Sequence, residues 1–164
     1  MKTKKYKLFW KIGDLNKHII CQPFDDNEEY YTFLKRQFDL GYRQIIVSSE
    51  AMIELIKYCV MNLGLNVYKI EFAEEDTSLS EDIAYLLNTI RERPVLFNNL
   101  VEKLLFLAEN SSIDINRIYI SGRSEEGVVK DFYIQSNGIV SISDYENNNL
   151  LDSIRTLIER CLFG

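Results

Sequence analysis

Two helix-like segments of the sequence each end at a glycine followed by an apolar residue, and a strand-like run comes directly after. The first ends at Leu40-Gly41-Tyr42 before RQIIVSS (43–49), and the second ends at Leu63-Gly64-Leu65 before NVYKIEFAEE (66–75). A left-handed glycine followed by an apolar residue is a common end of an α-helix. With the apolar run HIICQPF (18–24) in front, the order predicts β-α-β-α-β. Because such crossovers join parallel strands, we expect a parallel core.

Other patterns surround this core. YKLFWKI (6–12) alternates apolar and polar residues and predicts, with residues 18–24, an opening β-hairpin. Apolar residues at helical spacing predict a helical pair over 80–109, whose second helix begins at Pro94. Asn137-Gly138 predicts a hairpin within an antiparallel β-meander, and a C-terminal helix follows from about Asn149. The expected fold class is therefore α/β passing into α+β, in a single domain over residues 1–164, with any seam between lobes near residues 74–80.

Polar residues indicate where the helices begin. Asp26 or Asn27 is the expected N-cap of the first helix, since a short polar side chain can accept a bond from a free helix amide. Ser49 is the expected cap of the second helix. Ser78 to Glu81 has the spacing of a capping box.

The bulk composition excludes several classes of protein. With 46% hydrophobic and 27% charged residues, the chain is typical of a soluble globular protein. No run approaches the roughly 18 apolar residues of a membrane span, and the start lacks the apolar core of a secretion signal, so we expect a cytoplasmic protein. The net charge of −6 and the absence of a clustered basic face argue against nucleic acid as a partner. Abundant Ile, Asn, Lys and Tyr suggest a bacterial or phage genome.

The residues that carry common catalytic chemistry are absent or isolated. Cys21, Cys59 and Cys161 are far apart and lack the spacing of a zinc site, which indicates reduced thiols. His18, the single histidine, lies in an apolar strand, where a Cys–His nucleophile is not expected. The stretch GRSEEG (122–127) lies between two strands and reads as a hairpin loop rather than a phosphate-binding loop.

Acidic residues follow the three strands of the expected parallel core. The candidate binding residues are Asp25 and Asp26 after the first strand, Glu50 after the second, and Glu74, Glu75 and Asp76 after the third. The carboxyl ends of parallel strands meet at one edge of a sheet, so we expect these acids to form one rim. Two interpretations remain open. The carboxylates could hold Mg²⁺, or they could only cap and solvate the helix starts.

Residues 18–76 resemble the first unit of two-component receiver domains. DDNEEYYTFLKRQFDLGYRQIIVSSEAMIELI has the acidic pair, the helix ending in Leu-Gly-Tyr, the strand and the next helix. In that family the acidic pair binds Mg²⁺ beside a phosphorylated aspartate at the end of the third strand. The corresponding IEFAEED lacks an aspartate at that position, so the resemblance implies shared β-α packing and not membership.

Two functional hypotheses follow. The first is a non-catalytic cytosolic protein-interaction module, such as an inhibitor, immunity protein or regulatory subunit, which uses the acidic rim and the RSEEG loop (123–127) and needs no cofactor. Its partner would be another protein, with basic character favoured, and a strand edge would also allow a homo-oligomer. The alternative is a small Mg²⁺-dependent phosphate-handling enzyme at the same rim.

Overall fold

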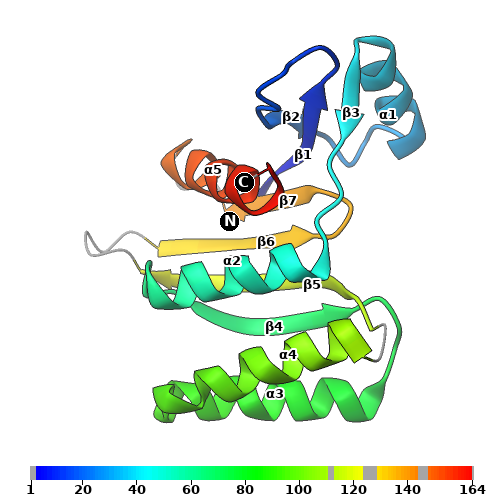
Figure 1. Cartoon of the computed structure of the whole chain (residues 1–164). Helices are drawn as coiled ribbons and strands as arrows, with labels where there is room; N and C mark the ends of the chain where they lie inside the picture. The colour runs from blue at the N-terminus through cyan, green and yellow to red at the C-terminus, as the bar shows by residue number, and fades with distance from the viewer. Residues whose placement is uncertain (1–2, 111–112, 124–128, 144–147, 164) are drawn as a thin grey trace.

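The structure, a computed structural model, describes residues 3–110, 113–123, 129–143 and 148–163. Within these residues the fold is mixed α+β, with one seven-stranded antiparallel sheet, five α-helices and a short 3₁₀ helix (Figure 1). The elements, in chain order, are β1 (Thr3–Lys11), β2 (Ile20–Phe24), α1 (Tyr30–Asp39), β3 (Tyr42–Gln44), α2 (Ser49–Met61), β4 (Asn66–Phe72), α3 (Thr77–Glu92), η1 (Pro94–Leu96), α4 (Phe97–Asn110), β5 (Ile115–Arg123), β6 (Val129–Gln135), β7 (Ile139–Ser143) and α5 (Asn148–Phe163).

The predicted parallel core is wrong, because the sheet is antiparallel. Its order is β2-β1-β7-β6-β5-β4, and the short β3 pairs with the end of β1. β2 and β3 are both antiparallel to β1, so they run in the same direction but are not neighbours. Four antiparallel steps lead from β1 to β4, so β4 runs opposite to β3. The arrangement expected from receiver domains is therefore also absent.

The physical reason lies in the later part of the chain. The prediction placed the strands over 18–24, 43–49 and 66–75 beside one another. In the structure, β7, β6 and β5 instead lie between β1 and β4. Of the predicted strand 43–49, only Arg43 and Gln44 belong to β3. Ile45 and Val47 nevertheless donate backbone hydrogen bonds to the carbonyls of Leu8 and Ser136, so this run extends along the sheet before α2.

The other predicted elements are confirmed. β1 and β2 form an antiparallel pair, and β5, β6 and β7 form the meander with its turn at Asn137-Gly138. α3, η1 and α4 form the helical pair, and α5 is the C-terminal helix. Gly41 and Gly64 have φ values of +89° and +66°, as predicted from their places after α1 and α2. Residues 124–127 of the RSEEG loop lie outside the described residues.

In Figure 1, α2 and α5 lie in front of the strands, and α4 and α3 continue the helix layer below β4, at the edge of the sheet. α2 is central to this helix layer, since it contacts α4, α5, β4 and β5. Met52, Ile53, Leu55 and Ile56 of α2 are fully buried in the main core. Apolar side chains at every third or fourth position thus place α2 against both the sheet and its neighbouring helices.

α1 packs on the opposite side of β1 and forms a smaller aromatic core. Phe33 of α1 lies 5.9 Å from Phe9 and 5.1 Å from Phe24, measured between ring centroids. Phe9 and Lys7 were predicted on the more polar face of the first strand, yet both are buried. The aromatic side of α1 covers this part of β1 and removes it from water.

The helix starts differ from those predicted. Glu29 is the N-cap position of α1, and its carboxylate accepts from the Thr32 hydroxyl rather than from a helix amide. The Asp25 carboxylate accepts a bond from the Asn27 amide in the preceding turn. Ser48, not Ser49, caps α2 by accepting from the Ala51 amide. Asp76 caps α3 by accepting from the Leu79 amide, in place of the predicted capping box. Two adjacent polar residues satisfy the same sequence rule, and the entering backbone decides between them.

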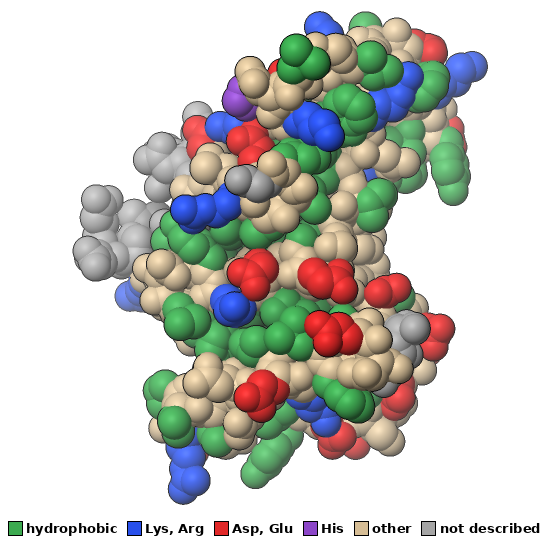
Figure 2. Space-filling view, in the orientation of Figure 1, with side chains coloured by type: hydrophobic (Ala, Val, Ile, Leu, Met, Phe, Trp, Pro, Cys, Tyr) green, Lys and Arg blue, Asp and Glu red, His purple; other side chains and the backbone are tan. Residues whose placement is uncertain are grey.

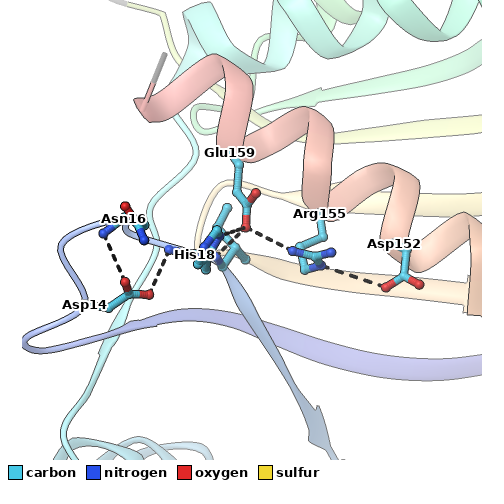
Figure 3. Close-up of polar contacts among 7 residues, drawn as sticks. Asp14, Asn16, His18, Asp152, Arg155 and Glu159 are labelled. Carbon is cyan, nitrogen blue, oxygen red and sulfur yellow. Dashed lines mark hydrogen bonds and ion pairs between the residues drawn. The ribbon is translucent and has the colours of Figure 1, made fainter.

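Glu159 joins α5 to the loop before β2 (Figure 3). Its Oε1 accepts bonds from the Ile19 amide at 2.6 Å and from Nη1 of Arg155 at 3.0 Å, and lies 3.8 Å from Nδ1 of His18. Asp14 holds the same loop by accepting from the amides of Asn16 and His18. One carboxylate therefore satisfies a backbone amide of a segment 140 residues earlier in the chain.

We expect Glu159→Ala to lower the free energy of unfolding by about 2 kcal/mol, because the Ile19 amide loses a charged acceptor. Asp152→Ala is the matched control, since Asp152 is exposed and its ion pair with Arg155 is 3.8 Å long. We expect that control to change stability by less than about 0.5 kcal/mol. Urea unfolding of the two variants measures the difference, and equal effects would contradict a special role for Glu159.

Candidate functional site

The sheet face opposite the helix layer carries aromatic and charged side chains. In β5, Ile118 and Ile120 enter the core, whereas Arg117 and Tyr119 point to the other side. β6 alternates in the same way, because successive side chains of a strand point to opposite faces. In β4 a register shift between Val67 and Lys69 breaks the alternation, so that Tyr68 contacts Tyr119 on the same face as Glu71. We call one group of residues the tyrosine face: Tyr68, Glu71, Arg117, Tyr119, Tyr133 and Gln135.

No described helix covers the tyrosine face over β4, β5 and β6, although α1 packs on the same side of the sheet over Lys7 and Phe9 of β1. The larger helix contacts of β4 and β5 are with α2 and α3, which pack through the main core. Strand register places Tyr133 opposite Tyr119, and Tyr119 opposite Lys69. Lys5 and Ser141 continue the same row across β1 and β7. The row thus crosses five neighbouring strands.

A chain of hydrogen bonds connects the side chains of this face. Arg117 donates from Nη2 to Oε1 of Gln135 at 2.7 Å and from Nη1 to Oη of Tyr119 at 2.9 Å. Tyr119 donates to Oε1 of Glu71 at 3.0 Å, and Lys69 forms an ion pair with the same oxygen at 3.3 Å. These contacts join β6, β5 and β4, so the polar groups are held in place without a ligand.

Contacts between aromatic rings also hold these side chains in place. The Tyr119 ring lies 5.5 Å from Tyr133 and 5.7 Å from Tyr68, measured between centroids. The Arg117 guanidinium lies 4.4 Å from the centroid of Tyr133. Burial lowers the pKa of Arg117, but its bond to Tyr119 and the nearby tyrosines and Glu71 raise it above its ordinary value. Arg117 is therefore a cation stacked on a ring, with its Nε left without a hydrogen-bond partner among the described residues.

Predicted acidic residue Asp26 borders the tyrosine face at the β2 edge of the sheet. Its Oδ1 accepts a bond of 3.0 Å from Nζ of Lys5. This bond raises the pKa of Lys5, burial opposes the rise, and Tyr133 adds to it. Asp25 instead holds the turn before α1.

The other predicted acids lie elsewhere. Asp114 connects the start of α2, where Glu50 lies, with the end of β4. Its carboxylate accepts a bond from the Ser49 hydroxyl, and its backbone carbonyl accepts one from the Ala73 amide. Figure 2 shows acidic side chains gathered over this side of the helix layer. Since β2 and β4 run in opposite directions at opposite edges of the sheet, Asp25 and Asp26 do not share an edge with Glu74, Glu75 and Asp76. The premise of a single acidic rim is therefore wrong.

Glu74 and Glu75 line a groove of about 550 Å³ beside β4. The side chains of α3 form one wall, the sheet residues Tyr68 to Ala73 form the other, and Asn116 of β5 completes the lining. Tyr68 and Glu71 belong to both the groove and the tyrosine face, so the two surfaces are continuous.

Metal binding and thiol chemistry are the other possibilities that the sequence raises. Within the described ranges, no group of three or more His, Cys, Asp or Glu residues could hold a metal ion. Cys21, Cys59 and Cys161 form no disulfide bond with one another, and burial raises the pKa of the Cys21 thiol to about 11. No helix in the described part of the chain is long and apolar enough to cross a membrane.

The sequence analysis missed the tyrosine face, although a signal was present. RIYIS and DFYIQ both alternate with period two, which places Arg117 with Tyr119 and Asp131 with Tyr133 on one side. The Asn137-Gly138 turn fixes only the β6–β7 register, so the sequence did not show which side the helices would leave uncovered.

Comparisons with protein-family models, with curated proteins and with solved structures found no match to this chain.

Proposed function

We propose that this chain is a non-catalytic protein-interaction module, of the inhibitor, immunity or regulatory-subunit type, whose partner docks on the tyrosine face. The observation that carries the proposal is the part of this sheet face over β4, β5 and β6, which no described helix covers and on which Arg117 and three tyrosines are held by hydrogen bonds and ring contacts. A sheet face that contacts only water does not require its side chains to be held in one fixed arrangement.

The residue types suit a protein contact. Tyrosine and arginine are enriched among the residues that contribute most to protein–protein affinity. Because Tyr119 and Arg117 are already held in one arrangement, docking costs little side-chain entropy.

The charges at the borders favour a partner with basic groups. Asp26 lies at one border beside Lys5, and Glu71, Glu74 and Glu75 lie at the other. The chain as a whole has a net charge of −6. Carboxylates around an aromatic centre steer a basic partner toward it and reject an acidic one.

The test compares capture of a partner by three folded proteins. Immobilised wild type, a variant with Arg117→Ala and Tyr133→Ala, and a control with Tyr85→Ala and Phe106→Ala are incubated with an extract of the source organism. Tyr85 and Phe106 are 71% and 60% exposed on α3 and α4, away from the tyrosine face. We expect the control to retain the captured protein and the first variant to lose at least about 90% of it, since interface anchors contribute 2 kcal/mol or more.

Circular dichroism and thermal unfolding establish that both variants are folded. Undiminished capture by a folded Arg117→Ala, Tyr133→Ala variant would contradict the tyrosine face as the contact surface. Photo-crosslinking from position 69 then identifies the partner segment that lies against the face.

A further inference from the structure

The outer edge of β4 is unpaired within the described structure. β4 pairs with β5 on one side, and it is the last strand in the sheet order. An edge strand presents backbone N–H and C=O groups that can pair with another extended chain. At about 3.4 Å per residue, the seven residues of β4 provide an edge roughly 20 Å long.

The groove beside this edge has two chemically different walls. α3 contributes the apolar side chains of Ile83, Ala84 and Leu87. The sheet side contributes Tyr68, Lys69 and Glu71, with Glu74 and Glu75 at the end of the strand. A strand placed here would point alternate side chains to the apolar wall and to the acidic border, because strand side chains alternate.

The charge of the groove decides between two occupants. Among its lining residues three carboxylates, of Glu71, Glu74 and Glu75, face one ammonium group, of Lys69. A second copy of β4 would bring the same excess of carboxylates and no basic group other than its own Lys69. A basic segment of another protein has the complementary charge.

We infer that the β4 groove binds an extended, basic segment of the partner by strand addition to β4. The inference rests on the proposed function and specifies which part of the partner is recognised. The favoured segment alternates Lys or Arg with Val or Ile. Its backbone pairs with β4, its aliphatic side chains lie on α3, and its cations lie beside Glu71, Glu74 and Glu75.

The test uses the full chain and a fluorescent hexapeptide in which lysine or arginine alternates with valine or isoleucine. Fluorescence anisotropy measures binding at two salt concentrations. Two comparison peptides have glutamate in place of the basic residues, or one central residue replaced by proline, which cannot donate a backbone hydrogen bond. We expect the basic peptide to bind at least about tenfold more tightly than either, and less tightly at high salt.

Protein variants examine the two walls separately. Glu74→Lys with Glu75→Lys reverses the acidic border, and Ala84→Trp fills the apolar wall from an exposed position. The matched controls are Glu102→Lys with Glu109→Lys and Asn99→Trp, all at exposed positions of α4 outside the groove lining. We expect about tenfold weaker peptide binding for each groove variant and no change for the controls.

Each other outcome overturns the inference. Equal binding of the acidic and basic peptides would exclude charge recognition, and equal binding of the proline peptide would exclude strand addition. A dimer that Ala84→Trp abolishes, with no peptide binding, would assign the edge to a second copy. If the peptide fails to bind while capture still depends on Arg117 and Tyr133, the groove inference fails and the proposed function stands. If the peptide binds but capture does not depend on Arg117 and Tyr133, the proposed function fails and the groove still binds a basic strand.

Discussion

Replacing Lys7 by methionine should raise the free energy of unfolding at pH 7 by about 2 kcal/mol. The Lys7 side chain is fully buried, and its Nζ has no hydrogen-bond partner among the described residues. The nearest ring is that of Tyr30, at 6.0 Å from the ammonium to the centroid. Burial lowers the pKa of Lys7 from 10.5 to about 8. Methionine fills a similar volume without a charge to desolvate, so the substitution removes a cost that folding now bears.

The same group predicts a specific pH dependence. Below about pH 8 the amine is protonated in both the folded and unfolded chains, so the full penalty applies. Between about pH 8 and 10.5 the unfolded chain binds the proton more strongly, and stability rises with pH by up to about 3 kcal/mol. The wild type should therefore gain stability relative to Lys7→Met through this range, as measured by urea unfolding at several pH values.

Lys5→Met is the matched control on the same strand. Lys5 is paired with Asp26, and its pKa is raised rather than lowered. We expect this substitution to give no gain at pH 7. A Lys7→Met variant that is folded but less stable than wild type at pH 7 would show that the buried ammonium contributes net stability.

Gly138→Ala should lower the free energy of unfolding by about 3 kcal/mol. Gly138 has φ of +82°, a conformation that costs about 1 kcal/mol for alanine. A Cβ atom there would also overlap the carbonyl oxygen of Ile45 and lie 3.4 Å from Nζ of Lys7. Relief of that overlap requires the β6–β7 turn to move away from β1, to which it is tied by the Leu8 amide bond to the Gly138 carbonyl.

Gly13→Ala separates the two contributions. Gly13 has a similar φ of +90°, but an added Cβ would meet no atom within 4 Å. The control should therefore cost only about 1 kcal/mol, as expected for backbone strain alone. Equal midpoint shifts for the two alanine variants in urea would show that the contact with Ile45 relaxes without cost.

Local patterns in the sequence determined most of the elements. The Asn137-Gly138 turn, the apolar stripe of α2 and the glycine endings at Gly41 and Gly64 each depend on a few neighbouring residues. Their conformations follow from sterics and side-chain period, which are readable within a short window. The helix caps were predicted to within a few residues, because Ser48 and Ser49 have the same side chain and only the chain path distinguishes them.

Strand order was decided by contacts between distant segments. β1 pairs with β7 some 135 positions later, and no local pattern distinguishes that neighbour from β3 or β4, since all present the same backbone groups. Because of this strand order the predicted single acidic rim does not form, and Asp26 and Glu74 lie at opposite edges of the sheet. The same order also brought Tyr119 beside Tyr133 and left the outer edge of β4 unpaired. Apart from most of residues 43–49, the sequence by itself thus determined which segments form helices and strands. Only the tertiary structure decided which strands are neighbours, because that choice depends on the packing of the whole helix layer against one face of the sheet.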